Sequence, residues 1–352
     1  MDFVSRKFDF NPGERCIVIG EIGVNHNNDR DTLFKLLDAG SHVGCDIIKL
    51  QRFKAEDEIA ESAPTTEYQV KAGEGDSQLE MAKKLELPDE LLVEAYEYCQ
   101  QMDIGFLCTA FDHGSVDFVA DVLGCKSVKV PSPEITNRPL IEYMAQKFDA
   151  LLVSTGASDL DEVAAVIEWI RNIGDREIAL MHCTSEYPAP IDQVNLTAIN
   201  TMRAAFELPV GYSDHTRGVV AGTVAASLGA AMIEKHYTLD KNMPGPDHNA
   251  SADIPELTQL VKAMKDVSLC LGDGIKRPVA AEAKNRLLIR KGFTCALDSM
   301  PAGTLIDASM LGIKRPLVKG AVEPFDLDKI VGQKISKSKR FDEPILWSDF
   351  NL

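Results

Sequence analysis

The chain has 352 residues, enough for a barrel-sized domain of about 250 residues and a small second unit. Acidic residues outnumber basic ones, 54 to 37, so the formal net charge is −17, and no dense run of Lys or Arg appears. This balance argues against nucleic acid and anionic membranes as partners. An anionic substrate is still compatible with it, provided that a few lysines and arginines gather in one pocket.

The eight cysteines stand singly, without the CxxC pairs typical of zinc sites or redox couples. Most lie in apolar surroundings such as FLCTAF and GFTCAL, so we expect free, buried thiols in a reducing compartment. The first residues, MDFVSRKFDFNPGER, lack the apolar core of a signal peptide, and no apolar run is long enough to span a bilayer. The sequence therefore predicts a cytoplasmic protein.

Short apolar, β-branched runs alternate with amphipathic helical stretches up to about residue 275. Runs that are apolar almost throughout are typical of parallel strands covered on both faces. Eight such units predict a closed (β/α)8 TIM barrel over residues 1–275, ending in a helix over 254–272. An open doubly wound sheet would gather polar residues only where its strand order reverses, whereas here they follow nearly every strand. The predicted strands cover residues 16–23, 46–53, 104–111, 127–132, 150–156, 177–184, 209–214 and 232–240.

The alternation stops after the predicted barrel. Residues 276–286 are polar and predict a linker, and residues 287–352 have short strand-like pieces broken by Pro, Gly and Asp. This indicates a small β-rich domain, near the lower size limit for independent stability. Residues 61–78, between the second strand and its helix, form a long polar loop that we interpret as a substrate lid.

Two histidines end the last two predicted strands, His215 in GYSDHT and His236 in EKHYTLD. Either alone would be read as an ordinary polar residue. At adjacent strand ends, with Asp247 following, the pair favours a shared divalent metal that polarises a substrate carbonyl. Zinc normally has a third strong ligand, so two histidines favour Mn2+ or Mg2+ completed by water and a substrate oxygen.

Two lysines lie within apolar strands, Lys49 in IIKLQ and Lys129 in VKVPS. Lysines are rarely buried without a partner, and an anion in the mouth of the barrel would satisfy both. Salt bridges to Glu21 or Glu134 are the structural alternative. Nearby hydroxyl groups that could join an anion site are those of Thr109, Ser132 and Ser154.

Glu21 and Glu134 are candidates for proton transfer, because a carboxylate in a partly dehydrated pocket can titrate near neutral pH. We assign Glu134, just after the fourth strand, to contact with a reacting water. Both carboxylates could equally be counter-ions of the lysines. Asn25 and His26, in NHNND, could lie near the site, and His182 could belong either to the site or to the core.

Together these motifs resemble the sialic acid synthase family, which comprises N-acetylneuraminate synthases and their legionaminic and pseudaminic relatives. The matching strings run in order from about residue 16 to about residue 316. They are GEIGVNHN, IIKLQRFKAED, FLCTAFD, VKVPSPEITNRPLI, VSTG, HCTSEYPAP, GYSDHT, EKHYTLDKNMPGPDHNAS and GIKRP.

The resemblance implies a barrel followed by an antifreeze-like SAF domain, which residues from about 287 onward would form. It also implies a domain-swapped homodimer, in which each small domain caps the barrel of its partner. Arg315, in the KRP string, would then reach the sugar-binding site of the other subunit.

The family's functional residues carry over onto matching positions. His215 and His236 would hold Mn2+, with Mg2+ or Co2+ as alternatives, and Glu134 would be the catalytic carboxylate, assisted by Lys129 and Glu21. Phosphoenolpyruvate would contact Lys49, Thr109, Lys129, Ser132, Ser154 and Ser213. The sugar would contact Gln51, Tyr187, Asp247 and Arg315.

The implied activity is the condensation of phosphoenolpyruvate with N-acetylmannosamine or a related amino-sugar aldehyde, with release of phosphate. The rival enzymes are another metal-dependent barrel aldolase or isomerase, and a phosphoenolpyruvate-using aldose-phosphate synthase, which usually lacks the appended domain. A sugar-binding or ice-binding module is the non-enzymatic alternative, but it would not need lysines and histidines at strand ends. The acceptor could be N-acetylmannosamine, its 6-phosphate, a diacetamido trideoxy sugar or mannose.

Overall fold

The computed structural model describes residues 15–64 and 77–351. The chain divides into two compact units, one ending at Asp273 and the other beginning at Gly274, and each is described by itself.

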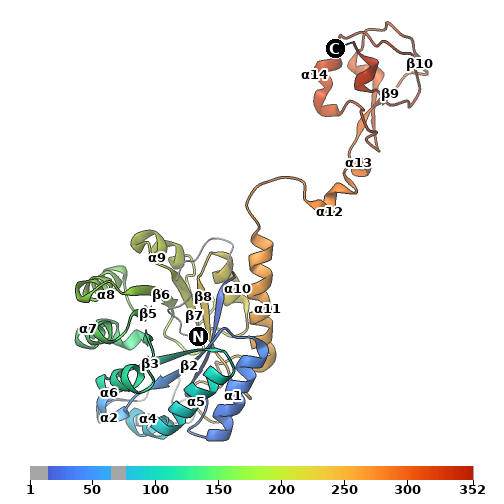
Figure 1. The fold of residues 1–352 in the computed structure, drawn as a ribbon. Coiled ribbons are helices and arrows are strands. Elements are labelled where there is room, and N and C mark those ends of the chain that lie inside the picture. The colour runs from blue at the N-terminus through green and yellow to red at the C-terminus, as the bar shows by residue number, and fades with distance from the viewer. Residues whose placement is uncertain (1–14, 65–76, 352) are drawn as a thin grey trace. The chain divides into compact units, whose positions relative to one another are not determined.

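The first unit is a closed barrel of eight parallel strands in chain order, with helices around the outside (Figure 1). The (β/α)8 barrel predicted from the sequence is thus confirmed. The strands are β1 (Ile17–Gly23), β2 (Ile47–Arg52), β3 (Gly105–Ala110), β4 (Ser127–Val130), β5 (Ala150–Ser154), β6 (Glu177–Cys183), β7 (Val210–Asp214) and β8 (Met232–His236).

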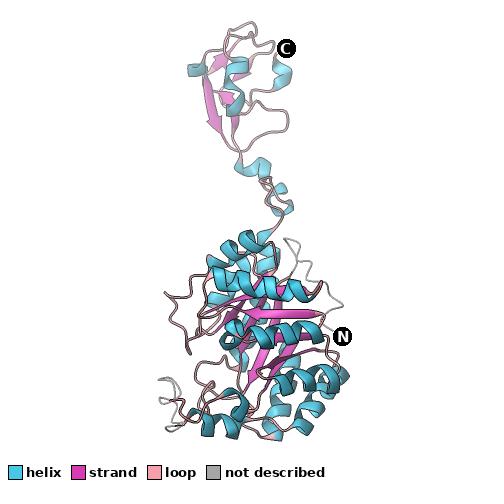
Figure 2. Cartoon of the chain, turned by 90° about the vertical axis from the view of Figure 1, so that its left-hand side faces the viewer, coloured by secondary structure: helices cyan, strands magenta, loops and turns pink. Residues whose placement is uncertain are grey.

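The helices of this unit follow the strands and form its outer layer, as Figure 2 shows by colour. They are α1 (Arg30–Val43), α2 (Ala55–Glu58), α4 (Gln78–Leu85), α5 (Asp89–Gln101), α6 (His113–Asp117), the π-helix η2 (Phe118–Val122), the 3-10 helix η3 (Ser132–Thr136), α7 (Arg138–Lys147), α8 (Leu160–Ile173), α9 (Ala198–Phe206), α10 (Val220–Ser227) and α11 (Ile254–Leu271).

Local sequence signals set the ends of several helices. Helices α8 and α11 each begin with a capping box, Asp159 with Glu162 and Asp253 with Glu256. Helix α1 ends at Gly44, whose φ of 87° favours glycine. Of the loop predicted over residues 61–78, residues 65–76 lie outside the described part of the chain.

Apolar residues fill the barrel on both sides of its strands. A large core lies between the strands and the surrounding helices. A second, smaller cluster, which includes Ile19, Leu107 and Leu152, fills the interior of the barrel. The polar residues two positions further along these strands therefore lie directly above this apolar layer, at the carboxyl ends of the strands.

The second unit contains small two-stranded antiparallel sheets and short helices. Its apolar core includes Phe293, Ile306 and Ile335. A buried ion pair, Lys339 Nζ to Asp349 Oδ2 at 2.5 Å, lies beside this core. The elements from Gly274 onward are α12 (Ala280–Ala283), α13 (Arg286–Ile289), β9 (Gly292–Cys295), β10 (Ser299–Met300), the 3-10 helix η4 (Ala308–Met310), β11 (Leu311–Lys314), the 3-10 helix η5 (Pro324–Asp326), α14 (Leu327–Ile330), β12 (Lys339–Arg340) and the 3-10 helix η6 (Trp347–Asp349).

All eight cysteines are unpaired, and six of them are buried, whereas Cys270 is exposed. None of the helices in the described parts of the chain is long and apolar enough to cross a membrane.

Candidate active site

A cavity of ≈ 400 Å³ opens at the carboxyl ends of the barrel strands. Its volume is in the range of small-molecule sites. It is lined by every site residue predicted in the barrel except Glu134, namely Glu21, Lys49, Gln51, Thr109, Lys129, Ser132, Ser154, Tyr187, Ser213, His215, His236 and Asp247.

The strand period of two explains why these side chains converge. In β8, Glu234 and His236 line the cavity, whereas Lys235 between them is buried on the other face, with its Nζ 2.9 Å from Asp214 Oδ2. Parallel pairing then aligns neighbouring strands, so that Glu21 is in register with Lys49 on one side and with His236 on the other. The closed barrel thus brings residues more than 200 positions apart into one cavity.

Two lysines and two glutamates form a buried charge cluster at the floor of the cavity. Lys49 Nζ lies 2.8 Å from Glu21 Oε1 and 3.7 Å from Glu234 Oε1, and Lys129 Nζ lies 2.8 Å from Glu234 Oε2. All four side chains are at most 5 % exposed. The salt bridge from Lys49 to Glu21 was the structural alternative for that lysine, and it is present. The same ammonium groups nevertheless line the cavity, so they are placed to meet an anion as well.

The pKa values in this cluster follow from burial and mutual attraction. Burial alone would raise the pKa of Glu234, but the ammonium groups of Lys129 and Lys49 outweigh it and hold that pKa well below its usual range. Burial raises the pKa of Glu21 despite the attraction of Lys49. Burial also lowers the pKa of Lys129, and Glu234 only partly offsets this. The Oε2 atom of Glu21 has no hydrogen-bond partner among the described residues, so it can still bind a substrate or water.

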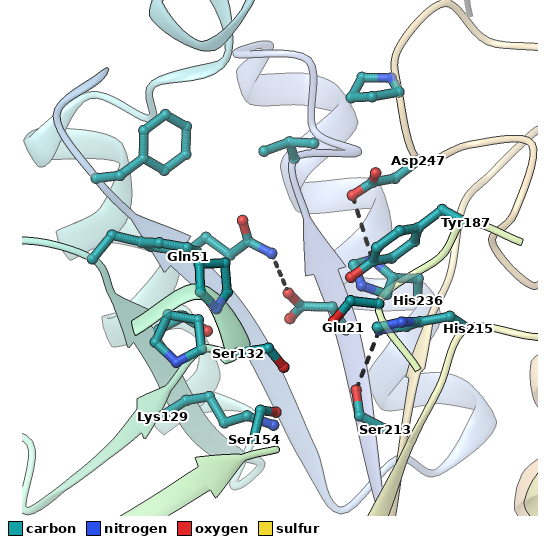
Figure 3. A pocket seen from close by; sticks show the side chains of 18 of the residues that line it. Glu21, Gln51, Lys129, Ser132, Ser154, Tyr187, Ser213, His215, His236 and Asp247 are labelled. Atoms are coloured by element: carbon teal, nitrogen blue, oxygen red, sulfur yellow. Dashed lines mark hydrogen bonds and ion pairs between the residues drawn. The ribbon is translucent and has the colours of Figure 1, made fainter. Parts of the chain in front are cut away.

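Hydroxyl groups surround the two lysines. Lys49 Nζ donates to Thr109 Oγ1 at 2.9 Å, and Ser213 Oγ donates to Glu234 Oε1 at 3.0 Å. Ser132 Oγ accepts a hydrogen bond of 3.0 Å from the backbone N–H of Gly156, in the loop after β5. Figure 3 shows Ser132 and Ser154 beside Lys129, which matches the predicted grouping of hydroxyl and ammonium donors.

The two histidines lie on the opposite side of the cavity, together with Tyr187 and Asp247 (Figure 3). The ring centroids of His215 and His236 are 5.6 Å apart, and Tyr187 stacks on His215 at 4.1 Å. Asp247 Oδ2 lies 3.6 Å from His236 Nδ1. Burial raises the pKa of Asp247 to about 6.

The chemistry of this pair fits two metal ligands. His215 Nδ1 donates to the carbonyl oxygen of Thr184 at 2.8 Å, an arrangement that leaves Nε2 with its lone pair. His236 Nδ1 is buried and has no hydrogen-bond partner in the described part of the chain. Burial, reinforced by the charge of Lys49, lowers the pKa of His236 well below its usual value and favours the neutral form that metals bind. Within residues 15–64 and 77–351, no group of three or more His, Cys, Asp and Glu side chains could hold a metal, so the pair would be completed by water or substrate.

Outside the cavity lining lie Glu134 and the three residues whose role the sequence left open, His182, Asn25 and His26. Glu134 lies on η3, where its Oε2 accepts a hydrogen bond of 2.5 Å from Asn137 Nδ2. His182, whose role the sequence left open, alternates with the lining residue Cys183, and its Nε2 contacts the carbonyl oxygen of Val194 at 2.7 Å. Asn25 and His26 are buried beneath the loops, and Asn25 donates to Ser251 Oγ at 2.8 Å.

Arg315 belongs to the second unit, where it follows β11 and its side chain is exposed. The predicted contact between this residue and a sugar site stays a prediction.

The sequence reasoning missed Glu234 and the wall that α2 and α4 contribute. Glu234 could have been found, because it precedes His236 by two residues within one strand and must share its face. The wall residues, which include Ile59, Met81 and Leu85, lie just before and just after residues 61–78, the segment that was predicted to be a polar loop. Glu58, at the end of α2, also lines the cavity and was overlooked.

The chain is similar to known protein families, sequences and solved structures. A model of the NeuB family matches residues 36–276, and a model of the SAF domain matches residues 296–351. The chain is 40% identical over 337 residues to the N,N'-diacetyllegionaminic acid synthase of Legionella pneumophila, covering 94% of both chains. It is 29% identical over 332 residues to the human N-acetylneuraminate-9-phosphate synthase, covering 94% of this chain and 91% of that one. A solved structure of an N-acetylneuraminic acid synthetase from Leptospira borgpetersenii, in complex with citrate, matches with a TM-score of 0.69 and 28% identity, over 78% of this chain and 91% of that chain.

Proposed function

This chain belongs to the NeuB family and carries a SAF domain, and on that premise we propose that it condenses phosphoenolpyruvate with an amino-sugar aldehyde and releases phosphate. The product is a nonulosonate, a sialic-acid-type sugar acid of nine carbons. The observation that supports this most directly is a single cavity with Lys129, Ser132 and Ser154 on one side and two imidazoles on the other. Such a cavity can bind an anionic enol phosphate beside a polarised carbonyl.

The proposed reaction joins three carbons to six. Carbon 3 of phosphoenolpyruvate attacks the aldehyde carbon of the open-chain sugar, and water adds at carbon 2. The tetrahedral centre then expels phosphate by cleavage of its C–O bond. Lys49 and Lys129 bind the phosphate and carboxylate groups, with hydroxyl donation from Thr109, Ser132, Ser154 and Ser213.

The remaining roles are proton transfer, orientation of substrate or water, and contact with the sugar. Glu134 handles the proton of the attacking water, which is supported by its place on η3, two residues after Ser132 of the cavity lining. Glu21 keeps Lys49 charged and uses its second oxygen to orient substrate or water. Gln51, Tyr187 and Asp247 contact the sugar at the cavity mouth.

His215 and His236 are the metal ligands in this proposal. When bound there, a divalent ion such as Mn2+, or Mg2+ or Co2+ in its place, supplies a Lewis acid for the aldehyde carbonyl. The enzyme acts in the cytoplasm, which is supported by the eight unpaired cysteines.

The test of the proposed function is a phosphate-release assay with phosphoenolpyruvate, Mn2+ and a panel of aldoses, combined with the mass of the product. We expect EDTA-sensitive release that depends on one aldose, and the Lys129→Ala and His215→Ala variants to be nearly inactive. Glu134→Gln should lower kcat by about 100-fold if the residue transfers a proton.

The outcomes separate this function from its rivals. Release that is indifferent to every aldose would contradict the condensation, and full activity after metal removal would contradict the metal assignment. An aldolase or isomerase that uses one sugar would release no phosphate at all.

The active form is a domain-swapped homodimer in which Arg315 serves the barrel of the other subunit. The exposure of Arg315 on the small unit supports this arrangement.

The test of the domain-swapped dimer is complementation between His215→Ala and Arg315→Ala chains, each expected to be weakly active alone. In a random mixture of dimers, one site in about four would combine an intact barrel with an intact Arg315 from the other chain. We therefore expect about a quarter of the wild-type activity after co-expression. If Arg315 served its own barrel, the mixture would gain no activity.

A further inference from the structure

The cavity has an apolar wall, which offers neither charge nor hydrogen bonds to the phosphate and carboxylate groups of phosphoenolpyruvate. Val24, Phe53, Met81 and Leu85 form a buried cluster on this side, with Ile59 and Phe111 packed against it. All six also line the cavity. The two charged groups of phosphoenolpyruvate bind to the lysines at the floor, so we assign this wall to the other substrate, the acceptor sugar.

The charge beside this wall is negative. Glu58 lines the cavity at an exposed position, and partial loss of hydration, with the neighbouring charges of Glu134 and Asp112, raises its pKa to about 7. Both oxygens of Asp112 are already bonded, Oδ1 to the backbone N–H of Ser115 at 2.7 Å and Oδ2 to that of Lys54 at 3.0 Å. These three carboxyl groups follow the three successive strands β2, β3 and β4.

Positive charge is confined to the floor. Of the described residues that line the cavity, the lysines and arginines are Lys49 and Lys129 alone, and both are tied to Glu21 or Glu234. Lys54, four residues before Glu58, does not line the cavity and pairs with Glu86 at 3.3 Å. Once the floor holds phosphoenolpyruvate, the described barrel lining has no Lys or Arg left for a second phosphate group, so a cation there would have to come from outside this lining, as the Arg315 proposed to reach it from the other subunit would.

We propose that Glu58 and the apolar wall select an acceptor without a phosphate group, and that Glu58 is the residue that rejects a phosphorylated sugar. The inference rests on the proposed function and adds the chemical class of its acceptor: an uncharged amino sugar with apolar substituents, such as acyl methyl groups, on the part remote from the aldehyde. A phosphate monoester carries between one and two negative charges near neutral pH, so the Glu58 carboxylate repels it. The wall offers it no hydrogen bond in exchange for lost hydration.

The experiment compares kcat/KM for N-acetylmannosamine and its 6-phosphate at about pH 8, where Glu58 is ionised. We expect the wild type to prefer the unphosphorylated sugar by at least about tenfold. The Glu58→Lys variant should shift this ratio toward the phosphate by about tenfold or more, and Glu58→Gln should shift it in the same direction by less. Asp57→Lys is the matched control, because Asp57 is exposed on α2, as Glu58 is, but does not line the cavity. It should leave the ratio unchanged.

The outcomes keep the two proposals apart. Phosphate release with a preference for the 6-phosphate, or an equal shift in the Glu58→Lys and Asp57→Lys variants, would overturn the selection by Glu58 and leave the condensation intact. If neither sugar supports release, the proposed function fails for these acceptors. Calorimetric titration of each sugar into the protein with phosphoenolpyruvate then still gives the ratio of the two binding affinities. A ratio in that titration that favours the phosphate would overturn the inference.

Discussion

Glu234 holds two buried ammonium groups within reach of one anion site. Without a carboxylate between them, Lys49 and Lys129 would repel each other, and burial would favour their neutral forms. Its position in β8 makes it a neighbour of both lysines, although it is 105 residues from Lys129 in the sequence. Such a role is visible from the sequence only after the barrel has been assumed, because the three residues share no local motif.

The substitution Glu234→Gln keeps the size and shape of the side chain and removes its negative charge. We expect the pKa of Lys129 to fall further, so kcat/KM for phosphoenolpyruvate should drop at least about tenfold, and more at alkaline than at neutral pH. The free energy of unfolding should fall by about 3 kcal/mol, as expected when a buried pair loses one partner. Steady-state kinetics across pH and urea unfolding would measure both effects.

Glu94→Gln is the control for that change, because Glu94 forms an exposed pair with Arg30 at 2.7 Å. Exposed pairs contribute less than about 1 kcal/mol, so this variant should match the wild type in kinetics. Equal kinetics for Glu234→Gln and the wild type would refute the positioning role.

At the scale of elements, the strands could be predicted because each is a short, nearly continuous apolar run that ends in polar residues. All eight expected runs contain an observed strand, and the predicted last helix matches α11 closely. Helices α2 and α4 could not be predicted in the same way. They are short, and their apolar residues, such as Leu79 and Met81, gain meaning only from packing against Phe53 of the barrel.

The loop after β5 positions the Ser132 hydroxyl through Gly156, and a substitution at Gly156 tests this contact. A Cβ atom on Gly156 would approach Ser132 Oγ to 2.7 Å and would collide with Ser185 Oγ. Gly156→Ala should therefore turn the Ser132 hydroxyl away from the cavity and raise KM for phosphoenolpyruvate by about tenfold, which is the effect of losing roughly one charge-assisted hydrogen bond.

The stability of Gly156→Ala should change little, since serine side chains can rotate. Ser132→Ala is the matched comparison and should raise KM to a similar degree. Thermal unfolding and steady-state kinetics together distinguish this from a general loss of structure, which would lower Tm and kcat while KM stays constant.

At the scale of the whole molecule, the positions of candidate residues on strands could be predicted from the sequence, whereas the positions of those on loops could not. The positions of Lys49, Lys129, His215 and His236 follow from strand ends meeting at one face. The place of Glu134 outside the lining, and the wall formed with α4, depend on how η3 and the segment after β2 pack. This packing depends on contacts between residues that are far apart in the chain, and local sequence patterns do not show such contacts.

The distribution of cysteines gives a prediction for the folded chain. Cys270 is exposed, whereas burial raises the pKa of Cys45 and of Cys99 to about 12. A thiol reagent at mildly alkaline pH should therefore react fastest with Cys270 and more slowly with the half-buried Cys125, and Cys270→Ser should remove the fast phase. The buried thiols should react only after unfolding in urea. Fast reaction of most thiols in the native protein would contradict the burial pattern.

The pairing of β1 with β8 also governs when the enzyme becomes competent during its synthesis. Glu21 leaves the ribosome early, but its register partner His236 follows more than 200 residues later. A nascent chain with seven strands has an open edge where β8 will enter, and it lacks both Glu234 and His236. Chemistry therefore cannot begin before the eighth strand closes the ring, and no shorter ribosome-bound fragment can turn over substrate.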